Sequence, residues 1–219
     1  MSALIWDNTG ERLFETGTKK GVLYTAKEAN PYGKATAWNG LIGVTEKPSG
    51  AEPTNLYADD IKYLALMSAE TYDATIKAYM YPDEFKPCIG DVEIEPGITI
   101  GQQSHEPFGF SYQTIIGNDT KSTAFGYKIH VVYGCLASPS EEDHETLNES
   151  PSASELSWEV STTPVAVTGH NPTATLEFDS TKLTPVQLKA LEDTLYGTTE
   201  KEASLPLPDA LINIVKTAV

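Results

Sequence analysis

The sequence predicts a mainly β protein, a β-sandwich or partial barrel, with one α-helix flanking it near the C-terminus. The first observation behind this prediction is the alternation of side chains, which is strict from Tyr72 to Met80 and is typical of a half-buried strand. The second is that proline, glycine and asparagine separate the alternating runs. The third is one clear helix-start signal, Thr184 to Gln187, followed by an apolar stripe at helical spacing.

The length of 219 residues suits one large all-β domain or two small ones. We predict one domain whose β-sandwich core spans residues 34–180. Residues 1–33 mix short apolar pieces with glycines, and they fit weak edge strands or an extended arm equally well. Residues 181–219 add the helix and a C-terminal tail to the same domain.

The charge limits the possible partners. The chain carries 31 acidic and 15 basic residues, a net charge of −16. Nucleic-acid binding depends on Lys and Arg, so this surface repels phosphate, and it does not suit an anionic membrane either. No apolar run approaches the roughly 18 to 20 residues that cross a bilayer. We see no secretory signal and expect the chain to fold in a cytoplasm.

The first strands are interrupted by a polar excursion. We predict strands over 34–44, 61–67 and 72–80, with Ile61, Tyr63, Ala65 and Met67 on one side of the second. Between the first two lies a long loop at 46–55, which is too polar to join the core. A long loop in a compact domain is usually functional or disordered, and we interpret this one as an inter-subunit arm. Its residues are Glu46, Lys47, Pro48, Ser49, Gly50, Ala51, Glu52, Pro53, Thr54 and Asn55.

The middle of the chain predicts a short helix and two hairpins. Pro82 followed by acidic residues is typical of a short helix, which Pro87 and Gly90 should end. A short strand pair then breaks at Pro96-Gly97. The clearest hairpin joins an alternating strand from 108–116 to a long strand from 125–135. Its apolar face is expected to continue through Cys135, a small core residue with a reduced thiol. Cys88 and Cys135 are too few for a disulfide scaffold.

The last third begins with a change of composition. Residues 138–154 are rich in Ser, Glu and Pro and predict a solvated acidic loop. Strands follow at 156–160 and 173–179. The capping box at Thr184 then opens a helix with Pro at its first position, and the helix should place its leucine stripe on a sheet face. The tail ends in an apolar cluster at 211–215, which needs cover from its own domain or a neighbour.

No catalytic, metal or cofactor site is predicted. The sequence has no glycine-rich phosphate loop, no zinc pattern among its histidines, and no nucleophile elbow around Ser111. Asp59-Asp60 could be an acid/base pair, but turn formation explains it more simply. The acidic run at 141–145 could hold a cation, but its spacing is unlike a calcium loop, and a solvated loop is expected.

Tyrosines are frequent on the predicted strand faces. They could form platforms for carbohydrate or nucleobases, but core and cross-strand packing is the better expectation. These residues are Tyr63, Tyr72, Tyr79, Tyr81, Tyr112, Tyr127 and Tyr133.

Several blocks carry a family resemblance. The run from Trp38 to Phe85, WNGLIGVTEKPSGAEPTNLYADDIKYLALMSAETYDATIKAYMYPDEF, closely resembles the major tail proteins of siphophages, the long-tailed phages with non-contractile tails. Blocks at 108–140 and 156–165 resemble the same family in the same order, and 191–215 is similar to the way those proteins end. The resemblance spans most of the chain but includes no catalytic signature, so it implies a structural role and transfers no active site.

The resemblance implies a tail-tube-like fold and a self-assembling virion protein. Hexameric rings would stack into a tail tube after synthesis and assembly in the host cytoplasm. The implied partners are copies of the chain itself, the tape-measure protein, and the tail terminator and distal tail proteins. DNA would pass through the lumen without specific binding, and an acidic wall would keep friction low.

Two alternatives stay open. One is the tube protein of a contractile or secretion-type machine, which shares the ring architecture. The other is a monomeric β-sandwich module that binds a glycan through exposed tyrosines. An enzyme is the least supported class.

Overall fold

The computed structural model describes residues 4–28, 30–144, 146 and 153–218 and confirms a mainly β fold. The strands of its main sheet are β1 (Leu13–Lys27), β2 (Asn30–Trp38), β3 (Leu41–Ser49), β6 (Thr71–Ala78), β9 (Phe108–Asn118), β10 (Ser122–Ala137), β11 (Leu156–Thr162) and β14 (Thr175–Asp179). They pair antiparallel in the order β2-β1-β9-β10-β11-β6-β3, and β14 also pairs with β10. The remaining strands form the pairs β4 (Pro53–Ala58) with β5 (Ile61–Met67), β7 (Val92–Glu95) with β8 (Ile98–Ile100), and β12 (Val165–Val167) with β13 (His170–Thr173).

The sheet curls so that a short turn joins its two end strands, which do not pair with each other. β2 and β3 are joined only by Asn39 and Gly40, although they lie at opposite ends of the strand order. The ring of Trp38, at the end of β2, lies 5.6 Å from Phe110 on β9 and 5.8 Å from Trp158 on β11. These contacts cross the inside of the curled sheet, which is a partial barrel. The single strand predicted over 34–44 is wrong, because Gly40 has a φ of +83° and turns the chain there.

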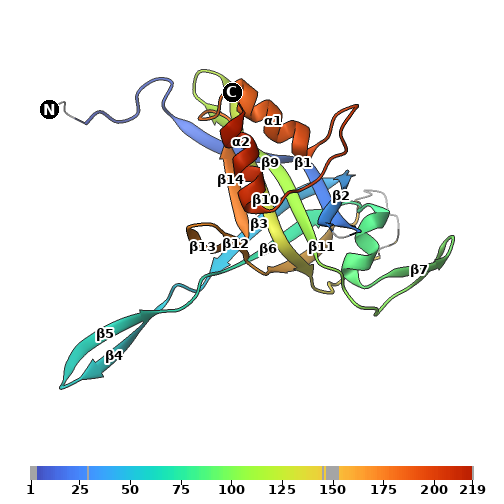
Figure 1. Cartoon of the computed structure of the whole chain (residues 1–219), viewed down its shortest axis with the longest axis horizontal. Coiled ribbons are helices and arrows are strands. Elements are labelled where there is room, and N and C mark those ends of the chain that lie inside the picture. The colour runs from blue at the N-terminus through green and yellow to red at the C-terminus, as the bar shows by residue number, and fades with distance from the viewer. Residues whose placement is uncertain (1–3, 29, 145, 147–152, 219) are drawn as a thin grey trace.

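Apolar side chains cover both faces of the curled sheet. The inner cluster includes Leu23, Trp38, Ile76, Phe85, Phe108, Phe110, Tyr112, Val132 and Trp158. The outer cluster includes Tyr24, Ile129, Val131, Tyr133, Leu191, Leu195, Leu205, Leu211 and Val215. Figure 1 shows the two C-terminal helices lying against this outer face. The two-sided burial explains why the central strands carry apolar residues at consecutive positions.

Cys135 is buried as predicted, but on the other face of the sheet. Gly134 adopts a φ of +60°, and the register of β10 with β9 shifts between Val132 and Cys135. This bulge moves Cys135 into the inner cluster with Val132, whereas Tyr133 lies in the outer one. Simple alternation could not anticipate the switch. Both cysteines are free and buried, and burial raises the pKa of the Cys88 thiol to about 12.

Two α-helices follow the sheet where one was predicted. The structure confirms α1 (Pro185–Leu195), with the capping box between Thr184 and Gln187 and buried Leu191 and Leu195 on the sheet. The second helix, α2 (Pro208–Thr217), contains the apolar tail cluster. Its Leu211 is fully buried beside α1, so the chain's own domain covers part of that cluster. The short helix after Pro82 is the 3₁₀ helix η1 (Asp83–Ile89), ended by Gly90 in the left-handed region.

The N-terminal strand β1 is an interior strand, next to the end strand β2. β1 pairs with β2 on one side and with β9 on the other, so the predicted weak edge strand is wrong for residues 13–27. Only part of its 15 residues is buried, which is why its sequence looks weak. The hairpin β12–β13 was not predicted either. Part of the acidic loop, residues 145 and 147–152, lies outside the described residues, and residues 138–144 have no regular structure.

Candidate functional site: projecting apolar segments

The most distinctive feature of the surface is a long hairpin, residues 50–70, which we call the arm. Figure 1 shows its strands β4 and β5 extending away from the curled sheet. Its tip is the two-residue turn Asp59-Asp60, with φ values of +49° and +62°. Positive φ at both central residues is the geometry of a type I′ turn, so the turn interpretation of this acidic pair holds. The carboxylates of the pair lie at the end of the arm, far from the core.

The loop predicted at 46–55 is wrong as a loop. Glu46 to Ser49 complete β3, and Pro53 to Asn55 begin β4, leaving only 50–52 between them. β3 tolerates Pro48 because it ends the strand order and pairs with β6 alone. The polar stretch is therefore the root of the arm. The part that reaches outward is the more apolar segment 56–67, of which only residues 61–67 were predicted as a strand.

The arm exposes large apolar side chains to solvent. On β4 and β5 they are Leu56 (42% exposed), Tyr57 (70%), Ile61 (63%), Tyr63 (69%), Leu64 (37%), Leu66 (53%) and Met67 (63%). A two-stranded ribbon of this kind is at best marginally stable alone in water. Contiguous exposed apolar surface also marks sites of protein association. The composition of the arm therefore favours a role in binding another protein surface.

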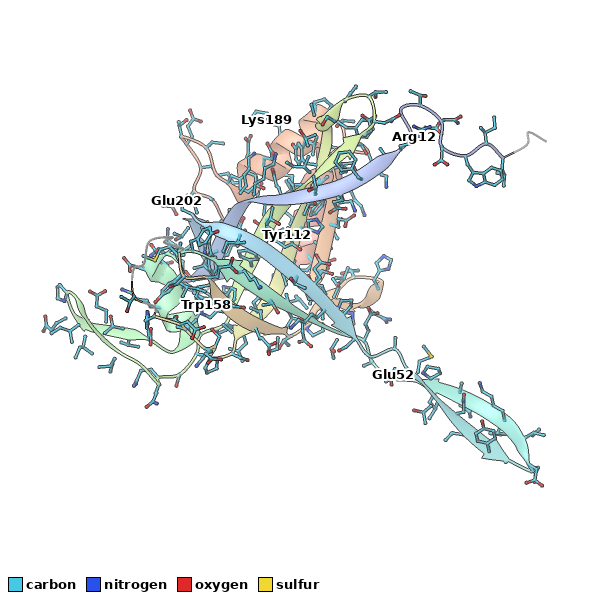
Figure 2. All side chains as sticks on the ribbon, turned by 180° about the vertical axis from the view of Figure 1, so that it is seen from behind. Arg12, Glu52, Tyr112, Trp158, Lys189 and Glu202 are labelled. Atoms are coloured by element: carbon cyan, nitrogen blue, oxygen red, sulfur yellow. The ribbon has the colours of Figure 1, made fainter. Side chains whose placement is uncertain are left out.

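A second hairpin projects at the other end of the molecule. Figure 1 places β7 at the opposite end of the long axis from the arm, and Figure 2 shows the same separation from behind. Its exposed apolar residues are Val92 (40%), Ile94 (55%), Ile98 (54%) and Ile100 (40%). The predicted break at Pro96-Gly97 is confirmed. The molecule thus presents apolar ribbons at two distant ends.

The N-terminal segment is the third projection. Leu4, Ile5 and Trp6 are each at least 74% exposed. Behind them, the backbone N–H of Gly10 donates to Asp119 at 2.9 Å and so fixes the base of the segment to the β9–β10 turn. An exposed tryptophan that follows two exposed aliphatic residues is a further candidate contact surface.

A polar cluster anchors the root of the arm inside the barrel. Tyr112 donates a hydrogen bond to Glu46, and its ring stacks on His130 with centroids 4.7 Å apart. The two nitrogens of His130 lie 3.5 Å from Glu15 and 3.6 Å from Glu46. Burial, and then the bond to Glu46, raises the pKa of Tyr112 far above its ordinary value. The cluster connects β1, β3, β9 and β10 near the root of the arm. Holding these strands together explains its polar residues without a catalytic role.

The same cluster predicts a small loss of stability in acid. Burial acts to raise the pKa of Glu15, but hydrogen bonds from Thr114 and Lys128 and the charge of Lys128 outweigh it, so the pKa lies below its ordinary 4.5. A lowered pKa stabilises the fold above about pH 4.5, and this contribution disappears as the pH falls through the folded-state value. We expect wild type to exceed Glu15→Gln in stability at pH 7, with the difference shrinking as the pH falls below about 4.5. Urea denaturation across this range measures it, and parallel pH profiles would contradict it.

The described residues include no group of three or more His, Cys, Asp or Glu side chains arranged to hold a metal ion. Of the acidic run at 141–145, residues 141–144 are exposed, and Glu145 lies outside the described residues. No helix in the described part of the chain is long and apolar enough to span a membrane.

The tyrosines divide into two groups. Tyr112 and Tyr133 are buried, and Tyr72, Tyr81 and Tyr127 are half-buried, as packing predicts. Tyr63 and Tyr79 are 69% and 52% exposed, so the packing prediction is wrong for them. Tyr63 lies on the arm, where the chain's own core offers nothing to cover it.

Comparison with known proteins adds no assignment: no model of a known family matches the chain, and no curated protein matches its sequence.

Proposed function

We propose that this chain is the structural subunit of a phage tail tube and that its copies assemble into stacked hexameric rings. The sequence resemblance between residues 38 and 215 suggests the family. The observation that carries the proposal is that one chain presents exposed apolar ribbons, β4–β5 and β7–β8, at opposite ends of its long axis. Exposed apolar surfaces of this kind are typical of protein–protein association and carry no catalytic groups.

Two different surfaces at distant ends favour heterologous contacts. A heterologous contact repeats from copy to copy, and it closes into a ring or continues as a filament. The end strands of the sheet order, β2 and β3, each pair with one strand of the sheet. Neighbouring copies would cover these edges, which otherwise risk uncontrolled pairing. In stacked rings, both the exposed apolar ribbons and the open edges of the sheet would be covered by neighbouring copies.

The net charge of −16 fits a tube that conducts DNA. An acidic wall repels phosphate, so DNA slides without binding. The other partners that we propose follow the resemblance: the tape-measure protein in the bore, and the tail terminator and distal tail proteins at the ends. The protein would be made in the host cytoplasm and would act in the virion tail.

Negative-stain electron microscopy of the purified chain at rising concentration tests the proposal. We expect rings or hollow tubes, together with light scattering that increases steeply with concentration. Solitary globules at all concentrations, or virions carrying this chain only on the outside of the tail, would overturn it.

One observation favours a second candidate, a glycan-binding module. Tyr57 and Tyr63 on the arm are 70% and 69% exposed, and aromatic faces suit sugar stacking. That candidate predicts a stable monomer whose glycan binding is lost in Tyr63→Ala. A concentration-dependent assembly without glycan binding would exclude it.

A further inference from the structure

The strand register gives the arm one continuous aliphatic face. Leu56 pairs with Leu64, and Ala58 pairs with Ile61, which leaves Tyr63 as an unpaired bulge residue. Residues that face each other across a pair, and those two apart on β4, point to the same side. The large side chains of this face are Leu56, Ile61, Leu64 and Leu66, and it also carries Thr54 and Ala58. The predicted grouping of Ile61 with Tyr63, Ala65 and Met67 is therefore wrong, because the bulge moves Ile61 to the leucine side.

The opposite side of the arm is more mixed. Tyr57 pairs with Lys62, Asn55 with Ala65, and Pro53 with Met67. A lysine and an asparagine on this side are easily solvated, whereas the leucine side has no charged group. Of the two sides, the aliphatic face therefore gains more from being covered by apolar surface.

The hairpin β7–β8 has an aliphatic face of similar kind. Val92 pairs with Ile100, and Ile98 lies two residues from Ile100 on the same side, together with its partner Glu95 at the tip, while Glu93 pairs with Thr99 on the other side. These three aliphatic side chains are 40–54% exposed. The hairpin stands at the far end of the molecule from the arm, so the two faces cannot cover each other within one chain (Figure 2).

We propose that the aliphatic face of the arm packs on the aliphatic face of β7–β8 in a second copy of this chain. This inference rests on the proposed function, and it identifies the surface of the neighbouring copy that the arm contacts. Both partners are two-stranded ribbons with branched aliphatic residues on one side, so they can stack as a small two-layer sandwich. Because donor and acceptor lie at opposite ends of one chain, each copy can give one such contact and receive one.

Charge sets the direction of the contact. The tip of the arm carries Asp59 and Asp60. The turn of β7–β8 lies between Glu95 and Ile98, and there the backbone N–H of Gly97 donates a hydrogen bond of 2.8 Å to the carboxylate of Glu93. Two acidic tips repel each other, so they point in opposite directions. Near the base of β7 lies Lys86, whose ammonium is 2.8 Å from Asp83 and 3.9 Å from Glu93. The arm tip therefore lies near the base of β7–β8, away from the acidic residues at its turn.

Disulfide trapping between two variants of the full chain tests the contact. Leu64→Cys and Ile98→Cys are mixed at high concentration and oxidised mildly; the native Cys88 and Cys135 are each only 1% exposed and do not compete. We expect a two-chain product from this mixture. The matched control replaces Leu64→Cys by Met67→Cys, on the opposite side of the arm, and should give about tenfold less product.

A charge exchange supplies the second measurement. Leu64→Glu should weaken association about 30-fold, as expected for a central apolar residue worth about 2 kcal/mol. Ile98→Lys in the other copy should restore much of the loss. Tubes that form without the Leu64–Ile98 product would overturn this contact but not the proposed function. The product without rings or tubes would support the contact and overturn the tube.

Discussion

Removal of the arm should abolish assembly and leave the barrel folded. The variant replaces residues 50–70 by Asn-Gly. Ser49 at the end of β3 pairs with Thr71 at the start of β6, and their hydroxyl groups are 2.7 Å apart. A two-residue turn can therefore join the two strands. The arm contributes no residue to either core cluster. Loop closure depends weakly on length, so we expect the free energy of unfolding to change by less than about 1 kcal/mol.

The assembled fraction, in contrast, should fall below detection in electron microscopy and sedimentation. The deletion removes every exposed aliphatic side chain of the ribbon at once. As a matched control, Lys62→Gln alters the other side of the same arm and should keep most of the assembly. A deletion variant that still forms tubes would exclude the arm as an assembly element, and one that does not fold would show that the arm supports the barrel.

Trp158→Ala should be the most destabilising single substitution that we predict. Trp158 is 2% exposed, and its ring packs 5.2 Å from Phe85, 5.5 Å from Tyr81 and 5.8 Å from Trp38. Truncation of such a side chain typically costs about 3–5 kcal/mol, because a cavity remains where the ring was. Domains are stable by only about 5–15 kcal/mol, so the variant should lose a large part of its stability.

Urea denaturation followed by far-UV circular dichroism measures this loss without depending on tryptophan fluorescence. The control is the same substitution at Trp6, which is 75% exposed and should change stability by about 0.5 kcal/mol or less. Equal stability of the two variants would mean that the ring cluster inside the barrel does not hold the fold together.

Local patterns anticipated those elements whose residues act over short distances. The hairpin of β9 and β10, the strand pair at Pro96-Gly97 and the helix after Thr184 all agree with the structure. In each case the signal is a turn or cap that lies next to the element. The second helix was missed because its start at Leu207 has no side-chain cap, and Pro208 alone is ambiguous.

The candidate site was anticipated only in part. The polar residues from Glu46 to Asn55 predicted a projecting segment in the correct region of the chain, but they form the root of the arm and not its tip. The aliphatic face was hidden because Leu56, Ile61, Leu64 and Leu66 combine across a bulge in the register of two strands. A sequence pattern on one strand cannot reveal how another strand pairs with it.

By itself, the sequence determined that this protein is mainly β, is strongly acidic, and has a helix that begins with a capping box at Thr184. These properties depend on composition, on alternation along one strand and on caps a few residues long. Only the tertiary structure decided that β1 is an interior strand, that Gly134 moves Cys135 to the other face, and that the hairpin of β4 and β5 projects into solvent. The physical reason is that an alternating strand can complete a core or an exposed ribbon equally well, and only its pairing partners and the space beside it distinguish the two.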